Sequence, residues 1–255
     1  MKKINIVIPL AGTNQFFDKS KYPYPTPLIE INNKTIIERV VNNFNSIKRD
    51  KQFIFILKSE DCKKYHLDKV LNLIMNDAYK VIKLENKTKG ALCSVMMAIE
   101  HINNDTSLIV ANSDQLFDDN LDEVISGFDD VDGGVITFES IHPRWSYART
   151  DESGCIVETA EKSPLSKNAI AGFFYFNHGR DFIDSAISTI KKDANLDGVY
   201  YISSTFNEMV LQNKRLVIHK IDNNKYHTFY SPKKIQEYEE GLMAGDRPFC
   251  TASEL

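Results

Sequence analysis

The first segment whose residue types suit chemistry is a loop that follows an apolar run at the start of the chain. Gly12, with the small Ala11 before it, would let backbone N–H groups approach phosphate oxygens closely. The nearby Lys19 and Lys21 would add positive charge. One glycine is more typical of an ordinary turn after a strand, since this loop has neither the G-x-G-x-x-G nor the Walker pattern. The loop is therefore a candidate phosphate site that needs support from other residues.

A carboxylate follows a second buried run, Ser107–Ala111, at Asp114. If this run is a strand of a parallel sheet, Asp114 lies at the carboxyl edge, where ligands of open α/β sheets bind. Mg²⁺ prefers one or two carboxylates together with phosphate oxygens and water, so Asp114 is a candidate metal ligand. The alternative is an aspartate that caps a turn, which is common in Asn-Ser-Asp sequences.

Cationic and aromatic side chains gather between residues 142 and 162. The planar fork of Arg144 suits a carboxylate or a phosphate, and Trp145 and Tyr147 would form the wall of a pocket. Trp145 would equally well anchor a hairpin to the core. Lys162 could act as a point charge on a phosphate, although a lysine beside Glu161 is more often a solvated strand end.

Alternating apolar patterns in the first half of the chain indicate the elements that position these residues. Strand-like runs alternate with helical patterns, which predicts a mixed, mainly parallel sheet with helices on both faces. The predicted strands are Ile4–Pro9, Phe53–Leu57, Tyr79–Leu84, Ser107–Ala111 and Val135–Phe138, and the predicted helices include Thr35–Phe44, Ala91–Ile99 and Leu121–Phe128.

After residue 140 the pattern changes. Two short runs flank the polar turn Asp151–Gly154, which predicts a hairpin, and Ala169–Phe176 is a strongly apolar strand. Helices over Asp181–Lys191 and Tyr201–Leu211, a strand over Leu216–Ile221 and a last helix complete the pattern. We expect one α/β domain over residues 1–242, in which residues 140–180 form a small substrate-facing β insertion, and a peripheral tail at 243–255.

Composition excludes several classes of protein. The chain has 255 residues, a formal net charge of −4 and 42% hydrophobic residues, which is ordinary for a globular domain and unlike a basic nucleic-acid-coating protein. No apolar stretch approaches the roughly 20 residues that cross a bilayer. The scattered Cys62, Cys93, Cys155 and Cys250 are typical of reduced thiols. We expect a cytoplasmic protein without nucleic-acid or membrane partners, for which a homodimer is an open option.

Taken together, the motifs resemble those of nucleotidyltransferases that convert phosphorylated sugars or alcohols into nucleoside-diphosphate derivatives. The family pattern is A-G-x-G-x-R-F, P-K-P-L, a loop that contacts the base, a metal-binding strand end and E-K-x-P. The corresponding segments are Leu10–Phe17, Pro25–Ile29, Lys89–Ala91, Ala111–Gln115 and Ala160–Pro164. Each match is weak alone, but five in this order make the resemblance specific over nearly the whole chain.

The resemblance implies a single Rossmann-like domain of the GT-A type, in which a nucleoside triphosphate and a phosphorylated acceptor give a nucleoside-diphosphate derivative and pyrophosphate. The acceptor phosphate is already anionic at neutral pH, so the enzyme must neutralise charge and align the reactants rather than supply a general base. Lys162 would hold the acceptor phosphate and Asp114 would hold Mg²⁺. The nucleotide-binding residues implied are Leu10, Ala11, Gly12, Thr13, Asn14, Thr88, Gly90, Ala91, Asn112 and Ser113.

Three positions depart from the family pattern. Phe16 stands where the family has an arginine, and Thr26 stands where it has the lysine of P-K-P-L. Both family residues neutralise triphosphate charge, so this chain either recruits Lys19 or Lys21 or is an inactive relative; we expect recruitment. The segment that begins at His227 lacks the family's second metal-binding aspartate, and an imidazole suits Mg²⁺ poorly.

The segments Asn112–Gln115 and His142–Tyr147 look most like cytidylyltransferases of surface-polysaccharide pathways, including capsule phosphoramidate synthesis. This likeness implies CTP as the nucleotide and phosphoglutamine, or else phosphocholine, as the acceptor. Arg144 or Glu161 would then recognise the amino-acid end of the acceptor, beside Trp145. The alternatives are a sugar-1-phosphate nucleotidyltransferase that uses UTP or dTTP, a metal-dependent glycosyltransferase, and a non-catalytic nucleotide-binding regulator. A dinucleotide oxidoreductase is disfavoured, because no G-x-G-x-x-G follows the first strand.

Overall fold

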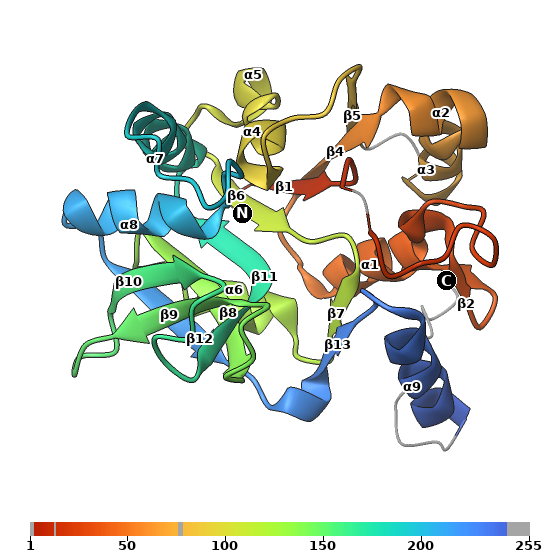
Figure 1. Ribbon diagram of the computed structural model, residues 1–255. Helices are drawn as coiled ribbons and strands as arrows, with labels where there is room; N and C mark the ends of the chain where they lie inside the picture. Colours follow the sequence, from red (N-terminus) through yellow and green to blue (C-terminus); the bar gives the residue numbers. More distant parts are fainter. Residues whose placement is uncertain (1–2, 13, 76–78, 244–255) are drawn as a thin grey trace.

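A large mixed β-sheet forms the centre of the protein (Figure 1). The computed structural model describes residues 3–12, 14–75 and 79–243, and within these residues the sheet has nine strands. One half is a parallel block in the order β5 (Tyr79–Leu84), β4 (Lys51–Lys58), β1 (Ile4–Pro9) and β6 (Ser107–Ala111). The chain runs from β1 outward to β5 and then returns to the other side of β1, so the strand order reverses between β1 and β6. This is the position at which open α/β sheets bind ligands.

The other half of the sheet is built around β11 (Asn168–Phe176), which is antiparallel to β6. On its far side β11 pairs with β8 (Gly133–Glu139), and β8 pairs in parallel with β12 (Leu216–Lys220). The expected hairpin is confirmed as β9 (Ser146–Thr150) and β10 (Ile156–Glu161). This hairpin extends the central sheet at its edge, through the pairing of Ala169 on β11 with Tyr147 on β9.

Gly172 divides β11 into two parts. Its φ of +64° is in the left-handed region, and the register of β11 against β8 shifts between Ile170 and Phe174. One part of β11 therefore pairs with β6 and the other with β9. A Cβ at Gly172 would lie 2.2 Å from the Asn112 side chain, so only glycine fits this bulge.

Two small sheets complete the strands. β2 (Glu30–Ile31) pairs with β3 (Lys34–Thr35), and β7 (Gln115–Phe117) pairs with β13 (Tyr226–Thr228). The second pair brings a segment from near the C-terminus beside the residues that follow β6.

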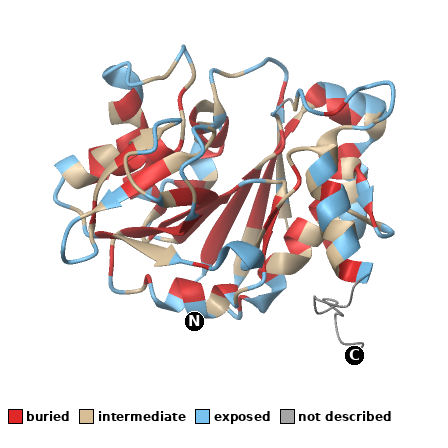
Figure 2. Ribbon diagram, turned by 60° about the horizontal axis from the view of Figure 1, so that its bottom comes forward, coloured by how far each residue is buried: buried red, intermediate tan, exposed pale blue. Residues whose placement is uncertain are grey.

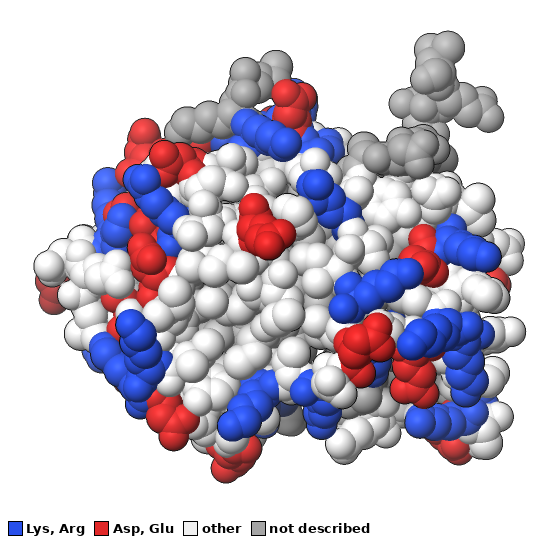
Figure 3. Space-filling model, turned by 90° about the horizontal axis from the view of Figure 1, so that it is seen from above, with Lys and Arg blue, Asp and Glu red and all other residues white. Residues whose placement is uncertain are grey.

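One face of the sheet is covered by the helices α1 (Ile36–Asn43), α2 (Ser59–Tyr65), α3 (Leu67–Met75), α6 (Leu121–Ser126) and α9 (Pro232–Met243). Thr35 caps α1, since its hydroxyl accepts a hydrogen bond from the backbone N–H of Glu38. Alternate residues of β4, such as Phe53 and Phe55, point into this core. Figure 2 shows the buried strands of the sheet between helices whose outer surfaces are exposed. Seen from above, Lys and Arg side chains are interspersed with Asp and Glu side chains (Figure 3).

The opposite face is covered by α4 (Ala91–Met96), α5 (Ile99–Ile102), α7 (Gly179–Lys191) and α8 (Ser203–Leu211). Ile54 and Ile56 of β4 point into this second core. The expected single helix over Ala91–Ile99 is wrong. The α-helix ends at Met96, because the N–H groups of Met97 and Ala98 donate to carbonyls three residues back, as in a 3-10 turn. The mixed α/β sheet with helices on both faces is confirmed. The tail predicted for 243–255 lies outside the described residues from 244 onward.

Candidate active site

The loops after β1 and β6 leave the sheet side by side. Val7 of β1 lies opposite Val110 of β6, so the chain emerges at Leu10 and at Asn112 from neighbouring strand ends. Leu10 itself is buried, and its N–H bonds to the carbonyl of Ile56 at 2.8 Å, so its side chain belongs to the core. Ala11 is half-buried.

Gly12 is exposed at this edge, and apart from its chain neighbours no described residue crowds the position of a Cβ there. Its φ is not in the left-handed region, and an added Cβ would meet no atom within 4 Å. The turn therefore does not need glycine for its backbone dihedral angles. The space beside the Gly12 backbone is open on the side where a Cβ would lie. Thr13, the next predicted nucleotide contact, lies outside the described residues.

Hydrogen bonds to two distant parts of the chain hold this loop. The Lys58 ammonium, at the end of β4, donates to the carbonyl of Gly12 at 2.9 Å. The Asn14 amide donates to the carbonyl of Tyr230 at 2.9 Å, and its oxygen accepts from Phe16 N–H. Sequence reasoning missed Lys58, although its position at the end of a predicted parallel strand was an available signal.

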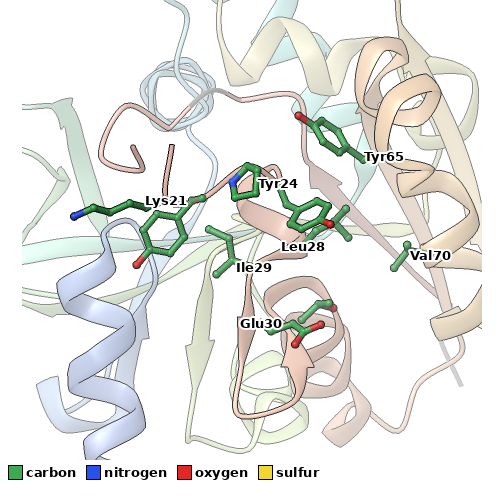
Figure 4. A pocket seen from close by; sticks show the side chains of 10 residues that line it. Lys21, Tyr24, Leu28, Ile29, Glu30, Tyr65 and Val70 are labelled. Atoms are coloured by element: carbon green, nitrogen blue, oxygen red, sulfur yellow. The ribbon is translucent and has the colours of Figure 1, made fainter. Parts of the chain in front are cut away.

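Lys19 and Lys21 are both exposed, and neither ammonium forms a hydrogen bond or ion pair with residues 10–12 or 14–17. Lys21 instead lines a cavity of about 620 Å³ (Figure 4). Aromatic and aliphatic side chains form most of its wall, together with Lys21, Glu30 and Thr35: Tyr22, Pro23, Tyr24, Leu28, Ile29, Tyr65 and Val70. Neither Asp114 nor Lys162 lines this cavity. The expected recruitment of Lys19 or Lys21 to the phosphate loop thus has no contact in its favour among the described residues.

Asp114 follows β6 and is half-buried. Burial raises the pKa of its carboxyl to about 6, an effect that its own backbone amide and the nearby Arg144 guanidinium partly oppose. Its carbonyl accepts from Phe229 N–H at 2.7 Å, which fixes the turn against the segment after β13. Asn112 N–H and the Gln115 side-chain amide both donate to the carbonyl of Gly172, at the β11 bulge, with distances of 2.9 and 2.8 Å. A glycine inside an apolar strand pattern was the sequence signal for this bulge.

The donor set around Asp114 fits a magnesium ion that keeps water and phosphate oxygens as its other ligands. The Asp114 carboxylate forms neither an ion pair nor a hydrogen bond with another described side chain, and Mg²⁺ needs only one or two carboxylates. The described residues contain no cluster of three or more His, Cys, Asp or Glu that could hold a metal by itself. His227 is engaged elsewhere: it is buried, and its Nε2 lies 2.7 Å from Asp118 Oδ2.

Arg144 lies among three aromatic rings. Its guanidinium carbon is 3.5 Å from the centroid of Tyr230, 5.4 Å from that of Phe16 and 5.5 Å from that of Trp145. Trp145 also packs edge-on against Phe138, with centroids 5.2 Å apart, so it anchors the loop and offers a ring face to Arg144.

Tyr147 does not face solvent. The side chain is fully buried, and its hydroxyl donates to the carbonyl of His142 at 2.7 Å. The predicted acceptor contact at Tyr147 is therefore corrected to an anchor for the loop at 142–146. Side chains alternate along a strand, and the sequence did not show which face of β9 is buried.

Lys162 is exposed at the end of β10 with its backbone in the left-handed region, at a φ of +55°. Its N–H donates to the carbonyl of Trp145 at 3.0 Å, and its ammonium lies 5.4 Å from the ring of Tyr201, whose hydroxyl raises the pKa of Lys162. Glu161 turns inward, where its carboxylate accepts from the hydroxyls of Ser146 and Ser203. Burial raises the pKa of Glu161, and these two hydrogen bonds oppose the rise.

The loop before α4 reaches the same region. Gly90 has a φ of +119°, and a Cβ there would lie 2.3 Å from the carbonyl of Tyr200. Tyr200 N–H in turn donates to the carbonyl of Lys89 at 2.8 Å. The Thr88 hydroxyl donates to the carbonyl of Gly90, and Ala91 is exposed at the start of α4. Tyr200 contacts this loop, and the next residue, Tyr201, contacts Lys162. The loop and Lys162 therefore lie on either side of residues 200–201.

A model of the nucleotidyl transferase family matches residues 22–224. The chain belongs to the nucleotidyl transferase family. The matched region begins after the Gly12 loop and includes Asp114 and Lys162. No curated protein sequence matched the chain. Within the described residues, no helix is both long enough and apolar enough to cross a membrane.

Solved structures share the fold of this family member. The nucleoside-diphosphate-sugar pyrophosphorylase of Vibrio cholerae aligns over 92% of this chain and 99% of its own, with 23% identity and a TM-score of 0.79. A UDP-glucose pyrophosphorylase complexed with UDP-glucose covers 96% of this chain and 100% of its own, with 17% identity and a TM-score of 0.77. A protein described as a glucose-1-phosphate thymidylyltransferase of Bacillus anthracis, in complex with sucrose, covers 96% of this chain and 97% of its own, with 17% identity and a TM-score of 0.75. At these identities the likeness shows a common fold.

Proposed function

We propose that the protein transfers a nucleotidyl group from a nucleoside triphosphate to a phosphorylated small molecule and releases pyrophosphate. The observation that carries this proposal is the convergence of the Gly12 loop and Asp114 at the adjacent carboxyl ends of β1 and β6. An open glycine loop beside a carboxylate without an ion-pair partner suits a phosphate chain and its cation.

In the proposed reaction, an oxygen of the acceptor phosphate forms a bond to the α-phosphorus of the nucleotide. The bond from this phosphorus to the β-phosphate oxygen breaks, and pyrophosphate leaves. The exposed ammonium of Lys162 binds the acceptor phosphate, and the Gly12 loop holds the leaving group through backbone N–H groups. Asp114 would hold a Mg²⁺ ion, which supplies charge neutralisation at the phosphates when bound.

For the substrates, the structural relatives favour UTP or dTTP together with a sugar 1-phosphate, because their names refer to sugar nucleotides and to a sugar phosphate. The expected CTP-dependent branch is not confirmed. It stands as the second candidate, with phosphoglutamine or phosphocholine as the acceptor. The likeness of the segments Asn112–Gln115 and His142–Tyr147 to cytidylyltransferases supports it.

A pyrophosphate-release assay tests the proposal by crossing the four nucleoside triphosphates and dTTP with glucose 1-phosphate, phosphocholine and phosphoglutamine, with Mg²⁺ present. We expect release with a pyrimidine nucleotide and a loss of turnover by orders of magnitude in Lys162→Ala. Lys167→Ala is the matched control, because Lys167 is an exposed lysine paired with Glu139. Nucleotide binding without pyrophosphate release in any combination would instead identify a regulator and refute the proposed transfer.

A further inference from the structure

The phosphate loop itself carries no positive side chain. Leu10–Phe17 contains neither Lys nor Arg, and position 26 is a threonine. A triphosphate chain that lies against backbone N–H groups still needs cations to offset its charge, and these must then come from other elements. Two cations reach the loop from different sides, Lys58 and Arg144.

Lys58 holds the loop and keeps donors free. Its ammonium has three N–H groups, and the hydrogen bond to the Gly12 carbonyl uses one of them. No described carboxylate lies within ion-pair distance of Lys58. Asp61 on α2 is near enough to interact with it through space but is buried, and Glu85 is occupied by Ser59 and Lys63.

Arg144 is positioned by rings rather than by hydrogen bonds. Its guanidinium lies over Tyr230 and beside Phe16 and Trp145, and it forms no ion pair or hydrogen bond with a described side chain. Stacking on aromatic faces leaves the five N–H donors of the planar fork available to an anion. The guanidinium is also close enough to Asp114 to lower the pKa of that carboxyl.

The loop connects the two cations. Gly12 contacts Lys58, and Asn14 donates to the carbonyl of Tyr230, the residue on which Arg144 stacks. A phosphate chain that lies along the loop would therefore have Lys58 at one side and Arg144 at the other. Phe16, which stands at the position of the family arginine, instead packs beside a guanidinium supplied by the loop at 142–146.

We infer that Lys58 and Arg144 are the cations that bind the phosphate chain of the nucleotide. This inference rests on the proposed function, and it places Arg144 on the nucleotide rather than on the acceptor. Lys58 acts from the end of β4, and Arg144 completes the site from the loop that precedes β9.

Calorimetric binding of tripolyphosphate, UTP, CTP and uridine tests this assignment in the full-length protein. Lys58→Gln and Arg144→Gln each lower the affinity for tripolyphosphate and for the triphosphates about tenfold or more, because each removes a hydrogen bond from a charged donor to a phosphate oxygen. The affinity for uridine stays unchanged. Lys63→Gln and Arg149→Gln are matched controls, since both side chains are exposed and paired with Glu85 and Glu158.

A second measurement covers the case in which a variant does not fold. In the wild-type protein, tripolyphosphate is expected to protect Lys58 from acetylation and Arg144 from phenylglyoxal, while Lys63 and Arg149 react as before. Wild-type triphosphate affinity in both Gln variants would overturn the inference. A rise confined to the acceptor KM in Arg144→Gln would assign Arg144 to the acceptor and overturn the part of the inference that concerns Arg144.

The two proposals fail in different ways. If tripolyphosphate binding depends on Lys58 and Arg144 but no nucleotide gives pyrophosphate, the cation assignment stands and the transfer reaction is refuted. If pyrophosphate is released at the same rate and KM by wild type and both variants, the transfer reaction stands and the cation assignment is refuted.

Discussion

Replacing Asp114 by asparagine should stabilise the metal-free protein at alkaline pH. Burial raises the pKa of this carboxyl from 3.8 to about 6, so the folded protein favours its protonated form. The resulting contribution to stability is fully present below the unfolded pKa near 3.8 and is lost as the pH rises through about 6. Above this range the folded protein must hold a charged, half-buried carboxylate, which the neutral asparagine replaces.

The size of the effect follows from the rise in pKa. One pKa unit corresponds to about 1.4 kcal/mol, so the rise sets an upper limit of about 3 kcal/mol. Because Asp114 is only half-buried, solvent screening reduces the expected gain to about 1–2 kcal/mol at pH 8. At pH 4.5 the gain should be much smaller, since the wild-type carboxyl is then protonated in the folded state.

Urea unfolding of wild type and Asp114→Asn at pH 4.5 and pH 8, with EDTA and then with Mg²⁺, measures these differences. Mg²⁺ should stabilise the wild type by mass action and leave the variant unchanged. Asp105→Asn is the control, because this exposed carboxylate pairs with Arg180 at the surface. The reasoning is refuted if Asp114→Asn is destabilised equally at both pH values, or if Mg²⁺ stabilises both proteins alike.

Three further substitutions test the supports of the site. Gly172→Ala should lower the free energy of unfolding by at least about 1–2 kcal/mol, since its φ of +64° disfavours a Cβ that would also meet Asn112; equal urea midpoints would contradict this. Tyr147→Phe should cost about 1 kcal/mol in thermal or urea unfolding, because it removes the hydrogen bond from the Tyr147 hydroxyl to the carbonyl of His142; an unchanged free energy of unfolding would contradict this anchoring role. Burial raises the pKa of the Glu161 carboxyl, so the contribution of this group to stability falls as the pH rises above 4.5, the ordinary pKa of a glutamate. The stability of wild type relative to Glu161→Gln should therefore decrease between pH 4.5 and pH 7.5. A constant difference would argue against a raised pKa.

The sequence predicted the parts of the site that depend on strand order. Gly12 and Asp114 each follow a buried apolar run, and the carboxyl ends of parallel strands meet at one edge, so their proximity was predictable. The sequence did not predict Lys58 as a loop contact, because which strand neighbours β1 is decided by the whole topology. The contact joins residues 46 apart in the chain.

Other features depend on packing that sequence patterns do not encode. The contact between Asn14 and Tyr230 joins residues 216 apart, and it exists because β13 pairs with β7. Tyr147 was predicted to face a ligand and is buried, because alternation along a short strand does not identify the inner face. Lys21 had the right charge for the phosphate loop, but the turn at Asp18 carries it to a different cavity.

The bulge at Gly172 in β11 has a consequence for how substrate preference can diversify. Asp114 is held by the bulge at Gly172 and by Phe229, neither of which belongs to the β9–β10 hairpin. The hairpin and its flanking loops, which carry Trp145 and Lys162, attach to β11 through a separate part of that strand. Substitutions within β9 and β10 can therefore change this edge of the sheet while Asp114 and the Gly12 loop keep their positions, provided that Arg144 in the flanking loop is retained. Directed evolution toward new acceptors would do best to randomise β9 and β10 and leave Arg144, Lys162, Gly172 and residues 107–117 untouched.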